Sequence, residues 1–329
     1  MSRKKDFYAT TPAPVAPSYA PVSGDFDWVG SDTEQMEAIP RPSISFWKDA
    51  MGRLFKNKAA IVFLFIIVTI FILSIIVPMV STYSVSEQHI AHGNAGMMYT
   101  DAVDGHVHLL GTDYLGRDLF VRLWSGGRIS IFIALSVTLI NCIIGMAYGG
   151  ISGYFGGSID NFMMRVLEVL NGIPYLIIVI LLLTIMKPGV STIIFALLLV
   201  GWTGMARLVR GQVISLKEQE FVVAAQAMGA SPVRIIARHL IPNTLSVIIV
   251  NITLAIPSAI FSEAFLSYLG LGVQPPLSSW GTLANEGAVV FQLFPLQLMA
   301  PALLISLTML SFNMLGDALR DAFDPKLRR

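Results

Sequence analysis

The fold is decided by residues 220–243, which read EFVVAAQAMGASPVRIIARHLIPN. Residues 218–228 favour a helix, and Gly229 is a natural cap for its end because glycine adopts left-handed backbone angles at little cost. Ser231 suits the N-cap of a second helix over residues 233–240, which is expected to stop before the next proline. The segment therefore predicts two short helices joined by a sharp turn.

The whole connection, residues 207–242, is too long for a simple turn between two neighbouring helices. Ala224, Ala225 and Ala227 leave a slim surface on the first short helix, and such a surface suits insertion into a groove of another protein. A surface hairpin without a partner is the alternative, and this segment alone does not decide between the two.

Beyond this connection, the chain is poor in charge. It has 329 residues, of which 13% are charged and 54% are apolar even without glycine, whereas a typical soluble domain carries about 25% charged residues. So apolar a composition excludes disorder over most of the chain, and the single cysteine, Cys142, excludes a disulfide-stapled secreted domain. The net charge of +1 argues against nucleic acid as a partner. The remaining class is an all-α polytopic membrane protein.

Six charge-poor stretches are long enough to cross a bilayer, because a helix needs about 20 mostly apolar residues to do so. They are expected over residues 59–80, from 129 to before 160, 169–186, 188–206, 243–268 and from about 296 to 316. Residues 269–295 contain glycines and prolines that break helices, which favours an external loop able to dip into a shielded cavity. The sequence thus predicts six transmembrane helices.

Lysine and arginine set the expected orientation. If the six spans alternate and the N-terminus is cytoplasmic, most of the 22 basic residues fall on the cytoplasmic side. Both termini are therefore expected in the cytoplasm, with residues 81–128 as an extracytoplasmic loop. Residues 1–45 are rich in proline and predict a disordered cytoplasmic tail. In residues 46–58 apolar residues recur at helical spacing with basic residues between them, which predicts either an amphipathic helix at the inner interface or an extension of the first span.

Polar residues inside the spans are candidates for a pore. Glu263 would cost roughly 2.5–3.5 kcal/mol in a helix that faces lipid, so it is expected to face the bundle or the pore. Asn251 and Asn313 are the other candidate pore residues, with Glu168 and Asn171 as weaker ones. A role in helix pairing is the alternative for each.

Two further patterns have a plain structural alternative. One helix face is expected to carry a stripe of four glycines spaced by four residues, namely Gly145, Gly149, Gly153 and Gly157. This stripe favours close packing in the bundle over a face that slides against a partner subunit.

The first external loop is expected to contain four of the five histidines, namely His89, His92, His106 and His108. Nothing in the sequence holds these histidines together, so no metal site is expected.

Catalytic patterns are missing from the sequence. It contains no G-x-x-x-x-G-K-[ST] phosphate loop and no Gly-Lys pair, so the chain is not expected to hydrolyse ATP. It contains no HExxH or G-x-S-x-G pattern either. No catalytic residue is assigned, and the energy for transport must come from a partner or from an ion gradient.

Residues 220–242 resemble the EAA loop of permease subunits of ABC importers, whose motif reads E-A-A, three residues, Gly, nine residues, I-x-L-P. Four motif positions are kept, namely Ala224, Ala225, Gly229 and Pro242. Three are replaced, with Val223 for the Glu, His239 for the Ile and Ile241 for the Leu. Glu218 or Glu220 could substitute for the missing acid.

Further segments narrow the resemblance to the C-type permeases of the dipeptide and oligopeptide branch. They are GTDYLGRDLFVRLWSGGRIS (111–130), GYFGGSIDNFMMR (153–165), FLSYLGLGVQPPLSSWG (265–281) and FNMLGDALRDAFDPKLR (312–328). The resemblance covers residues 47–329 and implies a type I ABC importer permease fold, with the transmembrane domain over residues 129–329. It also implies a place in the bacterial cytoplasmic (inner) membrane.

The resemblance implies partners and a mechanism. A second homologous permease would enclose the path, two cytoplasmic ABC ATPases would bind ATP and Mg²⁺, and an extracytoplasmic binding protein would deliver peptide. This chain would bind no cofactor. The implied ATPase-coupling residues are Glu220, Ala224, Ala225, Gly229, Ala230, Ser231 and Pro242. An importer of the same family for a nickel chelate or glutathione is the alternative, and a secondary transporter is a more distant one.

Overall fold

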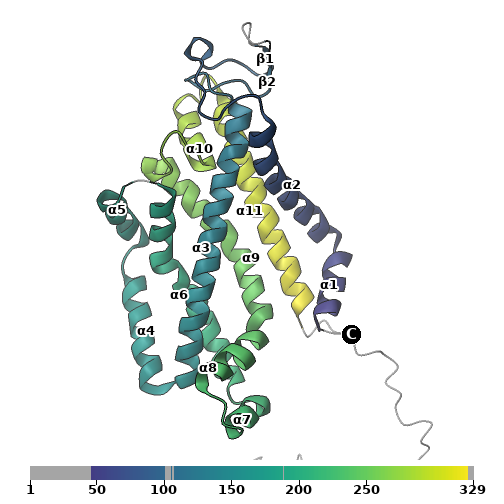
Figure 1. Ribbon diagram of the computed structural model, residues 1–329, viewed down its shortest axis with the longest axis vertical. Helices are drawn as coiled ribbons and strands as arrows, with labels where there is room; N and C mark the ends of the chain where they lie inside the picture. Colours follow the sequence, from purple (N-terminus) through teal and green to yellow (C-terminus); the bar gives the residue numbers. More distant parts are fainter. Residues whose placement is uncertain (1–45, 101–104, 106, 188, 325–329) are drawn as a thin grey trace, which may run out of the picture. The chain divides into compact units, whose positions relative to one another are not determined.

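The computed structural model describes residues 46–100, 105, 107–187 and 189–324. The tail expected over residues 1–45 lies outside these ranges. The described residues are mainly helical, which confirms the all-α membrane class, and they include one short antiparallel ribbon in which Tyr99 pairs with His108 (Figure 1).

The elements follow one another along the chain. The α-helices and strands are α1 (Phe46–Lys56), α2 (Lys58–Val80), β1 (Tyr99–Thr100), β2 (Val107–His108), α3 (Leu119–Phe155), α4 (Gly157–Gly172), α5 (Tyr175–Ile185), α6 (Val190–Leu216), α7 (Glu220–Ala227), α8 (Pro232–Ile235), α9 (Ile241–Leu266), α10 (Trp280–Val289) and α11 (Pro295–Phe323). Single turns of other helix types are η1 (Ile90–His92), η2 (Ile236–Leu240) and η3 (Ser267–Leu271). Residues 217–235, around α7, form what we call the α7 end, and the described residues of 81–118 (81–100, 105 and 107–118), with the ribbon, form the cap at the opposite end (Figure 1).

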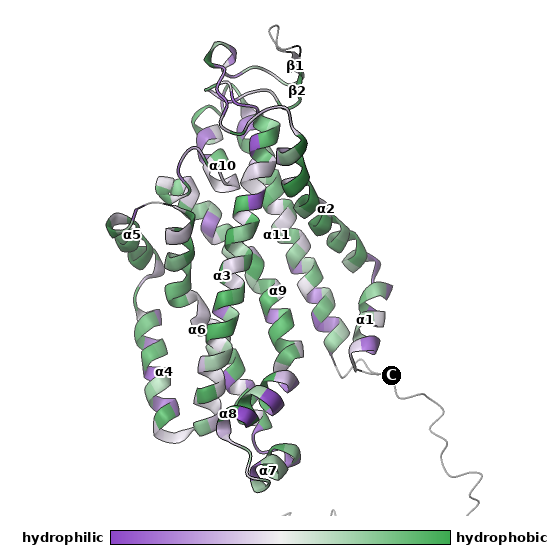
Figure 2. Cartoon of the chain, viewed as in Figure 1, coloured by the Kyte–Doolittle hydropathy of each residue, from purple (hydrophilic) through white to green (hydrophobic). Residues whose placement is uncertain are grey.

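Five helical segments among the described residues are long and apolar enough to cross a membrane, and Figure 2 shows how hydrophobic residues dominate them. The expected third span is instead a bent pair, in which α4 and α5 meet at 77°. The bend lies at Ile173 and Pro174, where proline removes a backbone donor and pushes the preceding residue out of helical angles. Counting this pair as one crossing gives six.

The second span begins earlier than residue 129. The Asp118 carboxylate accepts a hydrogen bond from the backbone N–H of Val121 at 2.7 Å and so caps α3, which starts at Leu119. The external loop expected over residues 81–128 therefore ends at Asp118. Arg122, which falls within the expected loop, therefore lies in the first turn of α3 and is buried.

Near the α7 end, the expected connection 207–242 is shorter in the structure. α6 continues to Leu216, because Val209 and Val213 are buried against the bundle and Arg210 is paired with an acid. The expectation that the second short helix stops before Pro242 is wrong. The helix runs on through the π turn η2, where Ile241 N–H bonds to Ile236 O, and this wider turn accommodates the proline ring.

Residues 269–295, expected as a loop, contain the buried helix α10. Ser279 and Thr282 form a reciprocal capping box at its start, and the fully buried Trp280 follows. Trp280 Nε1 donates to Leu123 O of α3 at 2.9 Å. The glycines and prolines that precede α10 end the previous helix but do not prevent a new one.

The glycine stripe of α3 packs against α6 of the same chain. A Cβ atom at Gly145 would lie 2.6 Å from Met205 Cβ, and one at Gly153 would lie 2.8 Å from Arg210 O. A Cβ atom at Gly149 would lie closer still to Ala206 O. Gly157 lies outside the stripe, beyond the turn that ends α3. These contacts favour ordinary packing within the bundle over a sliding face.

Candidate functional site

The α7 segment presents two different faces. Val222 and Ala225 are buried with residues of α6 and α8, whereas Val223 and Ala224 are exposed. Three alanines were expected to form one docking surface, but Ala225 is buried whereas Ala224 and Ala227 are exposed. The exposed apolar edge comprises Phe221, Val223, Ala224 and Met228.

Gly229 closes α7 with a backbone that favours glycine, since its φ is +78°. No atom lies within 4 Å of the position a Cβ would take, so the backbone angle and not crowding accounts for glycine here. Ala230 N–H donates to Ala225 O at 3.1 Å and completes the turn. Ser231 precedes α8 as expected, but its side chain makes no capping hydrogen bond.

The remaining residues expected to couple to an ATPase are spread along this segment. Glu220 is the exposed first residue of α7, and Ala230 packs on the buried cluster beneath that helix. Pro242 is exposed at the start of α9, after η2. The structure thus brings Glu220 to Ser231 together at the α7 end and leaves Pro242 apart from them.

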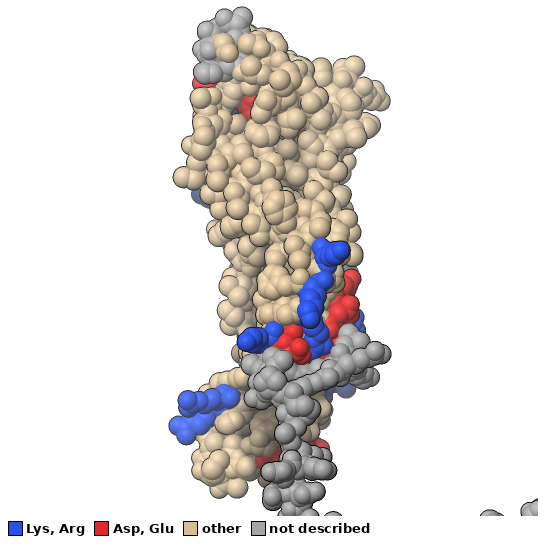
Figure 3. Space-filling model, turned by 90° about the vertical axis from the view of Figure 1, so that its right-hand side faces the viewer, with Lys and Arg blue, Asp and Glu red and all other residues tan. Residues whose placement is uncertain are grey.

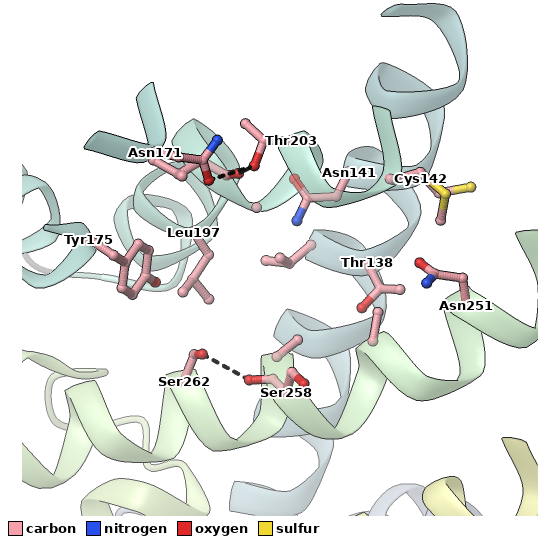
Figure 4. Close-up of a pocket in the computed structure, with 16 residues that line it drawn as sticks. Thr138, Asn141, Cys142, Asn171, Tyr175, Leu197, Thr203, Asn251, Ser258 and Ser262 are labelled. Carbon is pink, nitrogen blue, oxygen red and sulfur yellow. Dashed lines mark hydrogen bonds between the residues drawn. The ribbon is translucent and has the colours of Figure 1, made fainter. Parts of the chain in front are cut away.

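A cavity of about 340 Å³ lies between α3, α4, α5, α6 and α9 (Figure 4). None of the residues that line it carries a charge. Its polar lining consists of Thr138, Asn141, Asn171, Tyr175, Thr203, Asn251, Ser258 and Ser262. Thr203 Oγ1 donates to Asn171 Oδ1 at 3.2 Å, so α4 and α6 are joined across one wall. We call this space the central cavity.

Three polar atoms of this lining have no hydrogen-bond partner within the described part of the chain. They are Thr138 Oγ1, Asn141 Oδ1 and the Tyr175 hydroxyl, all of them buried. A buried polar atom is normally paired, because leaving it unpaired costs about 1–3 kcal/mol. The central cavity is therefore suited to a polar occupant that offers hydrogen bonds.

A second cavity of about 530 Å³, which we call the lower cavity, lies between α6, α9 and the last turn of α11. Asn251 lines both cavities, and Arg320, Phe323 and Asp324 line only the lower one. Among the three candidate pore residues, Asn251 is thus the one that reaches these spaces. Asn313 is exposed on α11 and lines neither cavity.

Glu263 is fully buried and lines neither cavity. Ser130 Oγ donates to its Oε2 at 2.8 Å, and Ser267 Oγ donates to its Oε1 at 2.7 Å. Ser130 also accepts the backbone N–H of Trp280 at 3.1 Å. The carboxylate therefore connects α3, α9 and the start of α10.

Sequence reasoning missed most of the lining of the central cavity. The signal was present, because Asn251, Ala255, Ser258 and Ser262 recur at helical spacing on α9 and form a stripe of small or polar residues. Thr138 and Asn141 form a shorter stripe on α3. Uncharged polar residues are common in membrane helices, so such stripes do not by themselves predict a cavity.

Charged residues form a buried cluster where the cap meets α10. Arg117 Nε donates to Asp113 Oδ2 at 2.6 Å, and Arg122 also bonds to Asp113. Arg122 Nη1 reaches Glu286 Oε2 of α10 at 2.8 Å. His108 is buried beside this cluster's loop, with Nδ1 at 2.8 Å from Asp118 Oδ2. No group of three His, Cys, Asp or Glu side chains suited to a metal ion occurs among the described residues.

Comparisons with known proteins agree with this architecture. The family model described as "Binding-protein-dependent transport system inner membrane component" matches residues 145–329. A second one, described as "N-terminal TM domain of oligopeptide transport permease C", matches residues 45–96. The structure titled "Inward facing conformations of the MetNI methionine ABC transporter" has a TM-score of 0.50 at 19% identity and covers 63% of this chain and 96% of its own, which supports the fold alone.

Curated relatives are closer in sequence. The dipeptide transport system permease protein DppC of Bacillus subtilis (strain 168) is 49% identical over 296 residues, 90% of each chain. The oligopeptide transport system permease protein OppC of the same strain is 46% identical over 304 residues, 92% of this chain and 97% of its own. OppC of Escherichia coli (strain K12) is 44% identical over 297 residues, 90% of this chain and 95% of its own. The chain therefore belongs to the family of binding-protein-dependent transport system inner membrane components, multi-pass membrane proteins, and within it to the dipeptide and oligopeptide permeases of type C.

Proposed function

We propose that this permease subunit forms half of the path by which an ATP-driven importer moves short peptides into the cell. The observation that carries the proposal is the central cavity, with its uncharged lining and its three unpaired polar atoms. A peptide offers backbone donors and acceptors whatever its side chains are. A lining of neutral hydroxyl and amide groups can bond to that backbone without favouring acidic or basic side chains.

The α7 end is the cytoplasmic side in this proposal. Described basic residues concentrate in the α7 end and in the helical turns next to it; they are Lys217 and Arg234 within it, Arg207 and Arg210 near the end of α6, and Arg238 in η2. Basic residues are retained on the cytoplasmic side of bacterial membrane proteins. The cap then faces the binding protein that delivers peptide, and the chain's N- and C-terminal ends are cytoplasmic.

Coupling to the ATPase takes place through α7 in this proposal. Its exposed edge at Phe221, Val223, Ala224 and Met228 would enter a groove of the ATPase, and the turn at Gly229 would hold it at the required angle. ATP and Mg²⁺ belong to that partner. A second permease, homologous to this chain, would supply the other wall of the path, and closure of the two ATPases would exchange its two open states.

The test is uptake of labelled dipeptides and tetrapeptides into proteoliposomes that contain the complete importer, with ATP hydrolysis measured in the same sample. Gly229→Val is expected to lower uptake per ATP hydrolysed at least tenfold while the subunit still inserts, because valine strongly disfavours a φ of +78°. Gly211→Val is the matched control, since a Cβ there also meets nothing within 4 Å but no positive φ is required.

Three outcomes would contradict the proposal in different ways. Normal coupling in Gly229→Val would remove α7 from the coupling step. Uptake of a nickel chelate or glutathione in preference to peptides would change the substrate. Uptake by this chain reconstituted alone would favour a secondary transporter.

A further inference from the structure

Helix α1 has one face that is buried against α11 and another that is largely exposed. Ala50 and Leu54 are buried against Ala318 and Ala322 of α11. Three large apolar side chains lie one turn apart on another face and remain exposed, by 43% at Trp47, 43% at Met51 and 53% at Phe55. Such a stripe costs free energy in water, so it requires a covering.

Lysines border this stripe. Lys48 and Lys56 are exposed on α1, and Lys58 is exposed at the first turn of α2, while Arg53 is paired with Asp49 at 2.6 Å. The described acidic residues near α1 are Asp49 on α1 itself, the exposed Asp317 and Asp321 on α11, and Asp324 directly after α11. Figure 3 shows Lys and Arg side chains together with acidic ones low on this face, below a broad uncharged surface.

The joint between α1 and α2 places this stripe at the edge of the membrane. Asn57 Oδ1 accepts hydrogen bonds from the N–H groups of Ala59 and Ala60, at 3.0 and 3.3 Å, so α2 starts at a defined point directly after α1. α2 is the apolar helix with the smallest buried share among the candidate spans, 17% of its most apolar window, and is suited to lipid contact. The stripe on α1 therefore lies where a lipid-facing helix leaves the hydrocarbon region.

We propose that α1 is a binding site for anionic phospholipids of the inner leaflet. Lys48, Lys56 and Lys58 bind the phosphate and headgroup charges, and Trp47, Met51 and Phe55 enter the boundary between headgroups and acyl chains. Aromatic and aliphatic side chains flanked by lysines are the combination that suits this boundary. The inference rests on the orientation proposed above, in which α1 lies on the cytoplasmic side.

Bound lipid would also act on the transport path. The rings of Trp47 and Phe323 meet edge to face, with centroids 5.6 Å apart, and Phe323 lines the lower cavity. A lipid that holds α1 against the membrane thus holds the last turn of α11 beside that cavity. The lipid composition of the membrane would thereby affect the position of the last turn of α11 in the wall of the transport path.

The experiment uses the complete importer in nanodiscs, with phosphatidylglycerol or phosphatidylcholine that carries a photoactivatable group on its headgroup. Labelled residues are mapped by peptide mass spectrometry, without ATP or peptide substrate. We expect residues 46–58 to be labelled by the phosphatidylglycerol probe in preference to the phosphatidylcholine probe. Each lysine changed to glutamine should lower this preference about fivefold, since a basic residue near the surface contributes about 1 kcal/mol.

Four variants separate the contributions of charge and of apolar contact to the labelling. The triple change K48R/K56R/K58R keeps the charge and should retain the labelling, whereas K48Q/K56Q/K58Q should lose it. K187Q removes an exposed lysine at the other end of the bundle and should leave α1 labelling unchanged. M51Q/F55Q should reduce labelling by both probes, because it removes the apolar part of the site.

Equal labelling of α1 by the two probes, or labelling that K48Q/K56Q/K58Q does not reduce, would overturn the lipid site. Absence of α1 labelling by both probes would overturn it as well, because the stripe would then be covered by protein and not by lipid. None of these results depends on peptide uptake, so failure of the transport proposal is distinguishable from failure of this one.

Discussion

Arg210 and Asp160 form a two-point ion pair at the lower part of the bundle. Arg210 Nε donates to Asp160 Oδ1 and Nη2 donates to Oδ2, both at 2.6 Å. Ser152 Oγ donates to the same carboxylate at 2.5 Å. Three helices, α3, α4 and α6, therefore meet on one buried acid.

Asp160→Asn should destabilise the subunit by about 1–3 kcal/mol, because it leaves the Arg210 charge without its partner; the value is reduced since a third of the arginine side chain is exposed. Arg210→Lys keeps the charge but gives up the two-point geometry, so its effect should be smaller. The thermal midpoint in detergent measures both. The double variant D160N/R210Q should cost less than the sum of D160N and R210Q, and simple additivity would show that the two residues do not interact.

Glu263 should tolerate an amide better than an apolar side chain. Glu263→Gln retains an acceptor for one serine and is expected to cost about 1 kcal/mol. Glu263→Leu leaves the hydroxyls of Ser130 and Ser267 without their acceptor in a dry interior and should cost about 2–4 kcal/mol. Thermal midpoints of the purified variants decide this. Equal losses for the two would mean that the hydrogen bonds contribute nothing.

Gly149→Ala and Gly204→Ala should change stability in opposite directions. A Cβ at Gly149 would contact backbone atoms of α6, including Arg210 N at 2.9 Å, so the two helices must separate at a cost of about 1–3 kcal/mol. At Gly204 a Cβ meets nothing within 4 Å, so alanine should stabilise α6 by up to about 1 kcal/mol. A stable Gly149→Ala variant would contradict the close packing of α3 on α6.

Asn251→Leu and Asn313→Leu are the same change on two neighbouring helices. Asn251 lines both cavities, and loss of its amide should lower peptide uptake by the complete importer about tenfold with the subunit still assembled. Asn313 lines neither cavity, so its variant should transport normally. The reverse ranking would place the path along α11 instead of along α9.

Hydropathy and charge in the sequence predict the long helices, because a run of about twenty apolar residues is compatible with few structures other than a membrane-spanning helix. The same pattern fails where a charged side chain is paired with a residue far away in the sequence. Arg122 looks like a loop residue until its contact with Glu286, which lies 164 residues further along the chain, makes it part of a buried helix. No local pattern contains that pairing.

Contacts between residues far apart in the sequence also explain why the helix α10 and the partners of Glu263 could not be predicted. Pro275 and Pro276 marked a loop, and the helix that follows them is stabilised by the burial of Trp280 against α3, a long-range contact. For Glu263, the serine four residues later is a local signal, but Ser130 is 133 residues away. The sequence could therefore predict that Glu263 avoids lipid, but not which partners it finds.

The length of α3 has a mechanical consequence. Its 37 residues span about 55 Å, well beyond the roughly 30 Å of the hydrocarbon core. One end carries Arg122, in the cluster beside the cap, and the other carries Ser152, bonded to Asp160. One continuous helix is therefore anchored by polar contacts at both of its ends, beyond the hydrocarbon core on either side. A tilt or rotation of α3 at one end would move the contacts at the other end directly, without a chain of side-chain rearrangements between them.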